Sequence, residues 1–215
     1  LEPRPRPRPL DGVTVALTDR VKKIPMEDEV ARGYEEAVRV CAGLGARIVE
    51  LPAPWTVDPD DLSCVLLTEA WSYHRAHADH HERYREQVAE FVEGAREFTD
   101  AQAYLAAQER RRLGAAMWEE WFAAQGVDVL LEPTLPILPL ERGPGYERGH
   151  PAGPEDPLVA FTALWDVTGM PVACLPVSWC VGVSLVAPRG HEAPLVQAAI
   201  DLQEHGLGIP GDPLA

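Results

Sequence analysis

The sequence predicts an α/β fold, and three observations lead to this class. Residues 13–18 and 47–51 are short apolar runs of strand length, and a helical pattern lies between them. A long stretch with helical periodicity covers residues 60–125. Two further apolar runs of strand length, at 172–175 and 181–186, come after a segment rich in proline and glycine. Alternation of strands with helices of this kind indicates a sheet covered by helices.

The first strand–helix–strand unit is the clearest of these signals. Its helical part carries apolar residues at three- and four-residue steps, and Gly43 and Gly45 mark its end. These apolar positions are Val30, Tyr34, Ala37, Val38, Cys41 and Leu44. A strand, a helix and a second strand within about forty residues form a βαβ unit, so we expect the strands at 13–18 and 47–51 to be parallel.

The helical stretch that follows divides into three expected helices. Asp60 or Asp61 is suited to cap the first, which carries apolar residues from 62 to 73. The second lies around residues 84–92, and Thr99 with Gln102 fits a capping box at the start of the third. Gly126 ends the third helix after Gln125, and residues 127–131 form the next expected strand.

The rest of the chain alternates between a broken segment and regular elements. Residues 133–157 contain seven prolines and four glycines, which predicts a long surface loop. A helix is expected over 158–168, followed by the strands at 172–175 and 181–186 and a final helix over 192–205. Cys174 and Cys180 either face each other across the hairpin between these strands or are small buried side chains, and the second alternative is favoured.

Composition excludes several classes of protein. The chain has 215 residues and a formal net charge of −15, so its overall charge repels nucleic acid. No run of 18 apolar residues occurs, so we expect no membrane span. Four scattered cysteines indicate reduced thiols in a cytoplasmic protein. Residues 1–10 form a tail rich in proline and arginine, and one domain is expected over 11–215.

The candidate binding residues are few. Trp71, Tyr73 and Trp165 are the candidates for lining a substrate pocket, although large aromatic residues at helical spacing more often belong to a core. On an α-helix His74, His77 and His81 would share one face, but they lack an accompanying metal-site motif, so no metal is expected. The turn over 19–25 has no glycine, which excludes a dinucleotide site, and no cofactor is expected.

Several segments together resemble a known family. They are Gly12–Leu17, a helix that ends Leu44-Gly45-Ala46, the run Val129-Leu130-Leu131-Glu132-Pro133-Thr134, the element Thr168-Gly169-Met170-Pro171, and Val181–Pro188 followed by Ile200-Asp201-Leu202-Gln203. In this order they resemble the carboxy-terminal half of an amidase signature enzyme, over residues 11–210. The resemblance implies a mixed sheet in an α/β/α arrangement and the hydrolysis of a carboxamide C–N bond.

The resemblance also implies a catalytic set that this sequence does not carry. The family uses a serine nucleophile, a bridging serine in a cis peptide and a lysine base, all in a Gly/Ser-rich stretch of the upstream half. A lone hydroxyl attacks amides too slowly, so the base and oxyanion donors are needed. No catalytic residue is therefore assigned here. We expect a portion of an amidase-like domain that is inactive alone, or a module that assembles with an amino-terminal half or with itself and then acts on a small amide.

The hairpin after Pro176 departs from the family pattern. Val177-Ser178-Trp179-Cys180 runs directly into Val181, where the family has a longer connection. No glycine or asparagine is present to adopt a positive φ in a tight turn. We therefore expect either a rebuilt hairpin or a decayed segment at this point.

Overall fold

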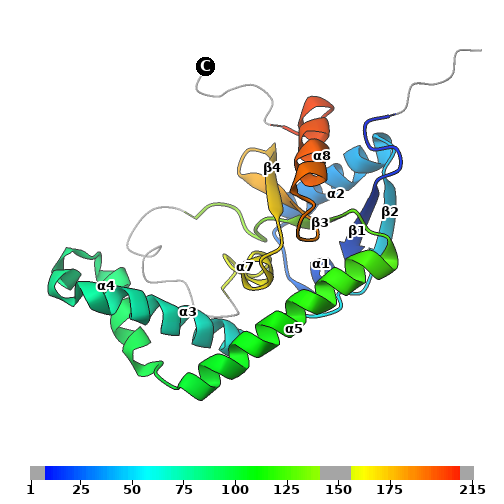
Figure 1. The fold of residues 1–215 in the computed structure, drawn as a ribbon. Coiled ribbons are helices and arrows are strands. Elements are labelled where there is room, and N and C mark those ends of the chain that lie inside the picture. Colours follow the sequence, from blue (N-terminus) through cyan, green and yellow to red (C-terminus); the bar gives the residue numbers. More distant parts are fainter. Residues whose placement is uncertain (1–7, 141–155, 209–215) are drawn as a thin grey trace, which may run out of the picture.

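A five-stranded mixed sheet lies at the centre of the chain, in a computed structural model that describes residues 8–140 and 156–208. In this part of the chain the strand order is β2-β1-β3-β5-β4 (Figure 1). The central strand β3 is parallel to β1, and β1 is parallel to β2, whereas β5 is antiparallel to both β3 and β4. The strands are β1 (Thr14–Thr18), β2 (Arg47–Leu51), β3 (Val129–Pro133), β4 (Val172–Ser178) and β5 (Val181–Val186). The predicted parallel pair and mixed sheet are confirmed.

Helices cover both faces of the sheet, which makes three layers (Figure 1). Helices α2 (Asp28–Gly43) and α8 (Glu192–Glu204) pack on one face. Helices α5 (Ala101–Gln125) and α7 (Ala163–Thr168) pack on the other. Successive strand residues point to opposite faces, so Leu131 belongs to the first core and its neighbour Leu130 to the second. Because both faces of the sheet are buried, the strand sequences are continuous apolar runs and do not alternate with polar residues.

Apart from the short helix α1 (Arg20–Lys23), which follows β1, the remaining helices form an arm beside this core. It contains α3 (Pro59–His74), a 3₁₀ segment (Arg75–Arg83), α4 (Glu86–Gly94) and a short 3₁₀ turn (Ala95–Glu97). Figure 1 shows that the arm lies along the first half of α5 and extends away from the sheet. Among the described residues no helix is both long enough and apolar enough to cross a bilayer.

The expected helix caps are displaced by one to three residues. Asp58, and neither Asp60 nor Asp61, caps α3, because its carboxylate accepts a hydrogen bond from the Asp60 N–H and Pro59 follows at the first helical position. Asp100, not Thr99, caps α5 by accepting from the N–H groups of Gln102 and Ala103. Gly126 ends α5 in the left-handed conformation, as predicted.

Some element boundaries also differ from the expectation. The helix predicted over 158–168 is reduced to α7, since residues 157–162 form turns. Strand β3 begins and ends two residues later than predicted. Of the expected loop over 133–157, residues 141–155 lie outside the described part, as do residues 1–7 of the tail.

The β4–β5 hairpin is closed by a residue in an unusual conformation. Ser178 pairs with Val181, so Trp179 and Cys180 form the connection, and Cys180 has a φ of 64°. Cys174 is opposite Ser184, and both Cys174 and Cys180 are exposed free thiols. Both alternatives for this pair were therefore wrong: the register pairs Cys174 with Ser184 and leaves Cys180 in the turn, and the outer face of β4 is uncovered.

Replacing Cys180 by glycine is expected to stabilise the chain. The left-handed region costs an L-residue about 1–2 kcal/mol, and glycine's larger loss of entropy offsets part of this gain. We expect Cys180→Gly to raise the free energy of unfolding by about 0.5–1 kcal/mol in urea titrations under reducing conditions. Cys180→Ala is the matched control, because it removes the thiol and keeps Cβ. A glycine variant no more stable than the alanine variant would contradict this explanation.

Candidate functional site

A row of polar side chains crosses four strands on the sheet face that α5 and α7 cover. Glu132 of β3 is directly opposite Ser184 of β5, and Ser184 is directly opposite Cys174 of β4. Thr18 of β1 extends the row, because its hydroxyl donates to Glu132 Oε1 at 3.2 Å. Thr18, Glu132 and Ser184 are buried, whereas Cys174 is exposed. The row therefore runs from the core to the edge of the sheet.

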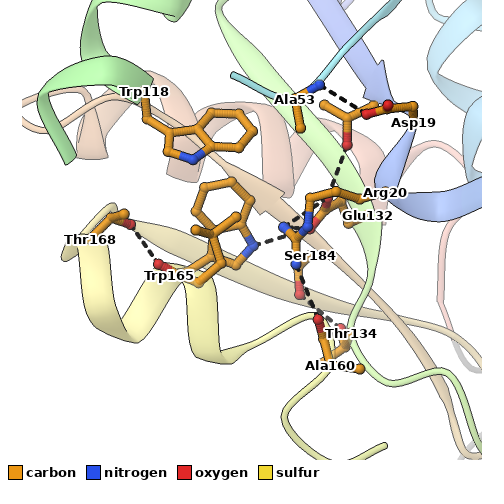
Figure 2. Close-up of polar contacts among 12 residues, drawn as sticks. Asp19, Arg20, Ala53, Trp118, Glu132, Thr134, Ala160, Trp165, Thr168 and Ser184 are labelled. Atoms are coloured by element: carbon orange, nitrogen blue, oxygen red, sulfur yellow. Dashed lines mark hydrogen bonds and ion pairs between the residues drawn. The ribbon is translucent and has the colours of Figure 1, made fainter. Parts of the chain in front are cut away.

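Glu132 is the most buried member of this row, with 0% of its surface exposed. Arg20 Nη1 donates to both carboxylate oxygens, at 3.1 Å to Oε1 and 3.0 Å to Oε2. The indole Nε1 of Trp165 donates to Oε2 at 3.2 Å (Figure 2). Together with Thr18, these donors give each carboxylate oxygen two hydrogen bonds, as expected for a buried charged group.

Arg20 links this carboxylate to the segment before α7. It is the first residue of the short helix α1 (Arg20–Lys23), and its Nη2 donates to the carbonyl oxygen of Ala160 at 3.1 Å. Its guanidinium lies 5.4 Å from the ring centre of Trp165 and 5.8 Å from that of Phe161. Burial raises the pKa of Glu132 and lowers the pKa of Arg20, so the hydrogen bonds must offset this desolvation.

The outer end of the row consists of hydroxyl and thiol groups. Ser184 Oγ lies 2.9 Å from Thr134 Oγ1 and 3.5 Å from Cys174 Sγ (Figure 2 shows the Thr134 contact). These groups can donate to or accept from a ligand. None of these contacts involves a base that could activate a nucleophile.

The lysines of the chain lie elsewhere. Lys22 Nζ is 2.5 Å from a carboxylate oxygen of Glu50, and Lys23 Nζ is 2.6 Å from one of Asp19. Within residues 8–140 and 156–208 neither lysine is hydrogen-bonded to a serine, and no peptide bond is cis. The described residues therefore contain no Ser–Ser–Lys arrangement.

The three aromatic residues expected in a pocket lie in two separate places. Trp71 and Tyr73 are on α3 in the arm, where the Arg96 guanidinium lies 5.3 Å from the Trp71 ring centre and Tyr73 is 67% exposed. Trp165 is 4% exposed and stacks edge-on against Trp118 in the core. The structure does not bring the three together, and their role in substrate binding stays a prediction.

The histidines also differ in geometry from the expected helix face. Residues 75–83 form a 3₁₀ segment with a non-helical residue at His77, so His74, His77 and His81 do not follow α-helical spacing. His74 Nδ1 bonds to the Tyr84 hydroxyl, and His81 Nε2 bonds to the His74 carbonyl oxygen. In the described residues no three histidine, cysteine or acidic side chains are grouped as a metal site.

Sequence reasoning missed the Arg20–Glu132 pair, although a signal for it exists. Glu132 interrupts an apolar strand that is otherwise fully buried, and Arg20 comes two residues after the end of β1. Because β1 and β3 are parallel neighbours, their carboxyl ends lie at the same edge. When two such strand ends carry residues of opposite charge, a buried ion pair between them is therefore expected.

Neutralising Glu132 is expected to destabilise the chain strongly. Glu132→Gln leaves the Arg20 guanidinium buried without its counter-charge, which typically costs about 3–5 kcal/mol. The free energy of unfolding from denaturant titration measures this loss, with the exposed Glu204→Gln on α8 as the matched control. The double variant Arg20→Met with Glu132→Leu should recover most of the loss. Equal free energies of unfolding for Glu132→Gln and the control would show that the ion pair does not stabilise the fold.

Comparison with known proteins connects this architecture to one family. The family model "Amidase" matches residues 3–196. An amidase from Pseudomonas putida is 32% identical over 158 residues, which is 70% of this chain and 33% of that protein. A glutamyl-tRNA(Gln) amidotransferase subunit from Cenarchaeum symbiosum (strain A) is 39% identical over 82 residues, covering 36% of this chain and 16% of that protein. The chain thus spans about a third or less of the curated relatives it matches.

Solved structures show the same fold at lower identity. A crystal structure described as an amidase superposes with a TM-score of 0.72 at 20% identity, over 93% of this chain and 46% of that one. A 6-aminohexanoate cyclic dimer hydrolase bound to its substrate superposes with a TM-score of 0.70 at 22% identity, over 92% of this chain and 45% of that one. The mixed sheet between helical layers is the shared architecture, and with the family match over residues 3–196 the conclusion is that this chain belongs to the amidase family.

Proposed function

We propose that these residues supply the carboxy-terminal part of an amide-hydrolysing unit and hydrolyse no amide by themselves. The serine nucleophile, bridging serine and lysine come from an amino-terminal half. The proposal is the same whether that half belongs to one polypeptide with this chain or to a partner chain. In the second case the chain is an assembly module that completes an amidase-like or amidotransferase-like fold.

The observation that carries this proposal is the uncovered outer face of β4. Ala173, Leu175 and Val177 point into the core under α2 and α8. The alternate residues Val172 and Cys174 point to the other face, and both are exposed, Val172 by 38%. On β3 and β5 the same face is buried under α5 and α7. An edge strand with one bare face is suited to receive further structure.

The polar row supports the same interpretation. Cys174, Ser184 and Thr134 place a thiol and two hydroxyls where the bare face begins. A site assembled against this face would receive hydrogen-bonding groups from this chain and its reactive groups from the other half. The separation of serines from lysines in the described residues agrees with this division of roles.

The proposal also includes the domain bounds, the aromatic residues and the cellular location expected from the sequence. The proposed unit comprises residues 11–215, with residues 1–10 as a tail. Trp71 and Tyr73 contribute to the substrate pocket from the exposed side of the arm, and Trp165 contributes by holding Glu132 in place. We place the unit in the cytoplasm, in accord with four free thiols.

The lone chain is expected to leave amides intact. Loss of a complete serine-based catalytic set removes about a million-fold in turnover, so hydrolysis of aliphatic and aryl amides should stay at the buffer rate. A chimera that joins the amino-terminal half of the Pseudomonas putida amidase to this chain should restore hydrolysis. The measurement is amine release, compared between the lone chain, the chimera and the chimera with its nucleophilic serine replaced by alanine.

Two variants test whether β4 is the surface that is used. Val172→Asp should lower the activity of the chimera, whereas Val196→Asp, at a 52% exposed position of α8, should not. The proposal is wrong if the lone chain releases amine after repeated purification and Ser184→Ala alters that rate. It is also wrong if a folded chimera, shown so by circular dichroism, stays inactive.

A further inference from the structure

A small cavity lies between the arm and the core, apart from the polar row. Its volume is about 220 Å³, and it is bounded by α3, α5, α7 and the segment that precedes α3. Its walls are mostly apolar and include Trp55, Val57, Leu62, Val65 and Val167. A space of this size accommodates a ligand with one ring or a short alkyl chain and favours an apolar body.

The wall formed by Trp55 is held rigidly. A side chain at Gly114 of α5 would lie within 2.6 Å of the Trp55 indole, so only glycine permits this close approach. The main-chain carbonyl of Trp55 also accepts a hydrogen bond from Trp118 Nε1 at 3.1 Å. The Trp55 wall of the cavity is therefore preformed.

The charged groups that face the cavity leave an excess of negative charge. Asp61 of α3 is neutralised by Arg110, whose Nε donates to it at 2.6 Å. Among the described residues, Arg111 of α5 binds only neutral acceptors, the Val167 carbonyl at 2.5 Å and the Gln108 side chain at 3.1 Å.

Two carboxylates at the cavity have no cationic partner in the part of the chain that the structure describes. Glu69 of α3 accepts from neutral donors, the Tyr104 hydroxyl at 2.9 Å and the Gln108 amide at 3.0 Å. Asp166 of α7 has no ion pair or side-chain hydrogen bond with any residue in the described ranges. Partial burial raises the pKa of Asp166. Two carboxylates against one guanidinium give the cavity a net charge of about −1.

We propose that this cavity binds a small organic cation, an ammonium group carried on an apolar body. The ammonium group lies at the mouth, beside Asp166, and the apolar part contacts Trp55, Leu62 and Val65. The formal charge of −15 over the whole chain adds a field that attracts cations. This inference is independent of the proposed function, because the cavity is formed by this chain alone.

Benzylamine is the probe that tests the proposal, with benzyl alcohol as its neutral counterpart and benzoate as its anionic one. Titration of the full chain, followed by ligand-observed NMR at neutral pH and low salt, should give benzylamine a dissociation constant on the order of 1 mM. Benzyl alcohol should bind about three- to fivefold more weakly, because it lacks an ion pair at a solvent-exposed mouth. Benzoate should bind more weakly still.

The variant Asp166→Asn separates a specific site from general attraction. It should weaken benzylamine binding about three- to fivefold and leave benzyl alcohol binding unchanged. Asp201→Asn on α8, on the far side of the sheet, is the matched control and should change neither. Lowering the pH through the raised pKa of Asp166 should weaken benzylamine binding alone.

Three results would overturn the proposal. The first is equal binding of benzylamine and benzoate, and the second is benzylamine binding that Asp166→Asn leaves unchanged. The third is that no benzylamine binding is detected at a benzylamine concentration about ten times the expected dissociation constant. Far-UV circular dichroism of both variants would establish that each is folded.

Discussion

The burial of Glu132 is the constraint on which the rest of the structure depends. A carboxylate in the middle of a sheet, covered by helices, needs a counter-charge and several donors, and it receives them from two separate segments. Thr18 and Arg20 come from the end of β1 and the start of α1, and Trp165 comes from α7. The same arginine donates a hydrogen bond to the Ala160 carbonyl. The ion pair therefore also holds the segment that precedes α7 against the sheet. Removal of either partner would leave the other charged and buried.

The fold could be predicted in large part because its determinants are local. The strands at 13–18 and 47–51 and the helix between them follow directly from the periodicity of apolar residues. Gly126 marks the end of α5, because the chain adopts a positive φ there and glycine tolerates it. The caps are displaced because residues able to cap a helix stand close together at both places, and only the backbone geometry selects Asp58 and Asp100. Residues 158–162, where a helix is expected, form turns, and the helix begins only at Ala163.

The candidate site was less accessible from the sequence, because it depends on strand register. Glu132, Ser184 and Cys174 are far apart in the chain, and only pairing across β3, β5 and β4 aligns them. The cavity beside Asp166 depends likewise on the packing of α3 and of Trp55 against α5, and Gly114 permits the close approach of Trp55. Trp165 is buried beside Glu132, so its ring serves the ion pair as well as the core, and its role in a substrate pocket stays a prediction.

The central claim is that the bare face and edge of β4 receive structure from a catalytic half, and hydrogen exchange tests it most directly. In the lone chain, the amides of β1 and β3 should exchange slowly, because both strands have a partner on each side. The β4 amides that point away from β5 should exchange fast. In the chimera with the amino-terminal amidase half, these β4 amides should become protected. Strong protection of all β4 amides in the lone monomer would contradict the account, because the chain would then close its own sheet.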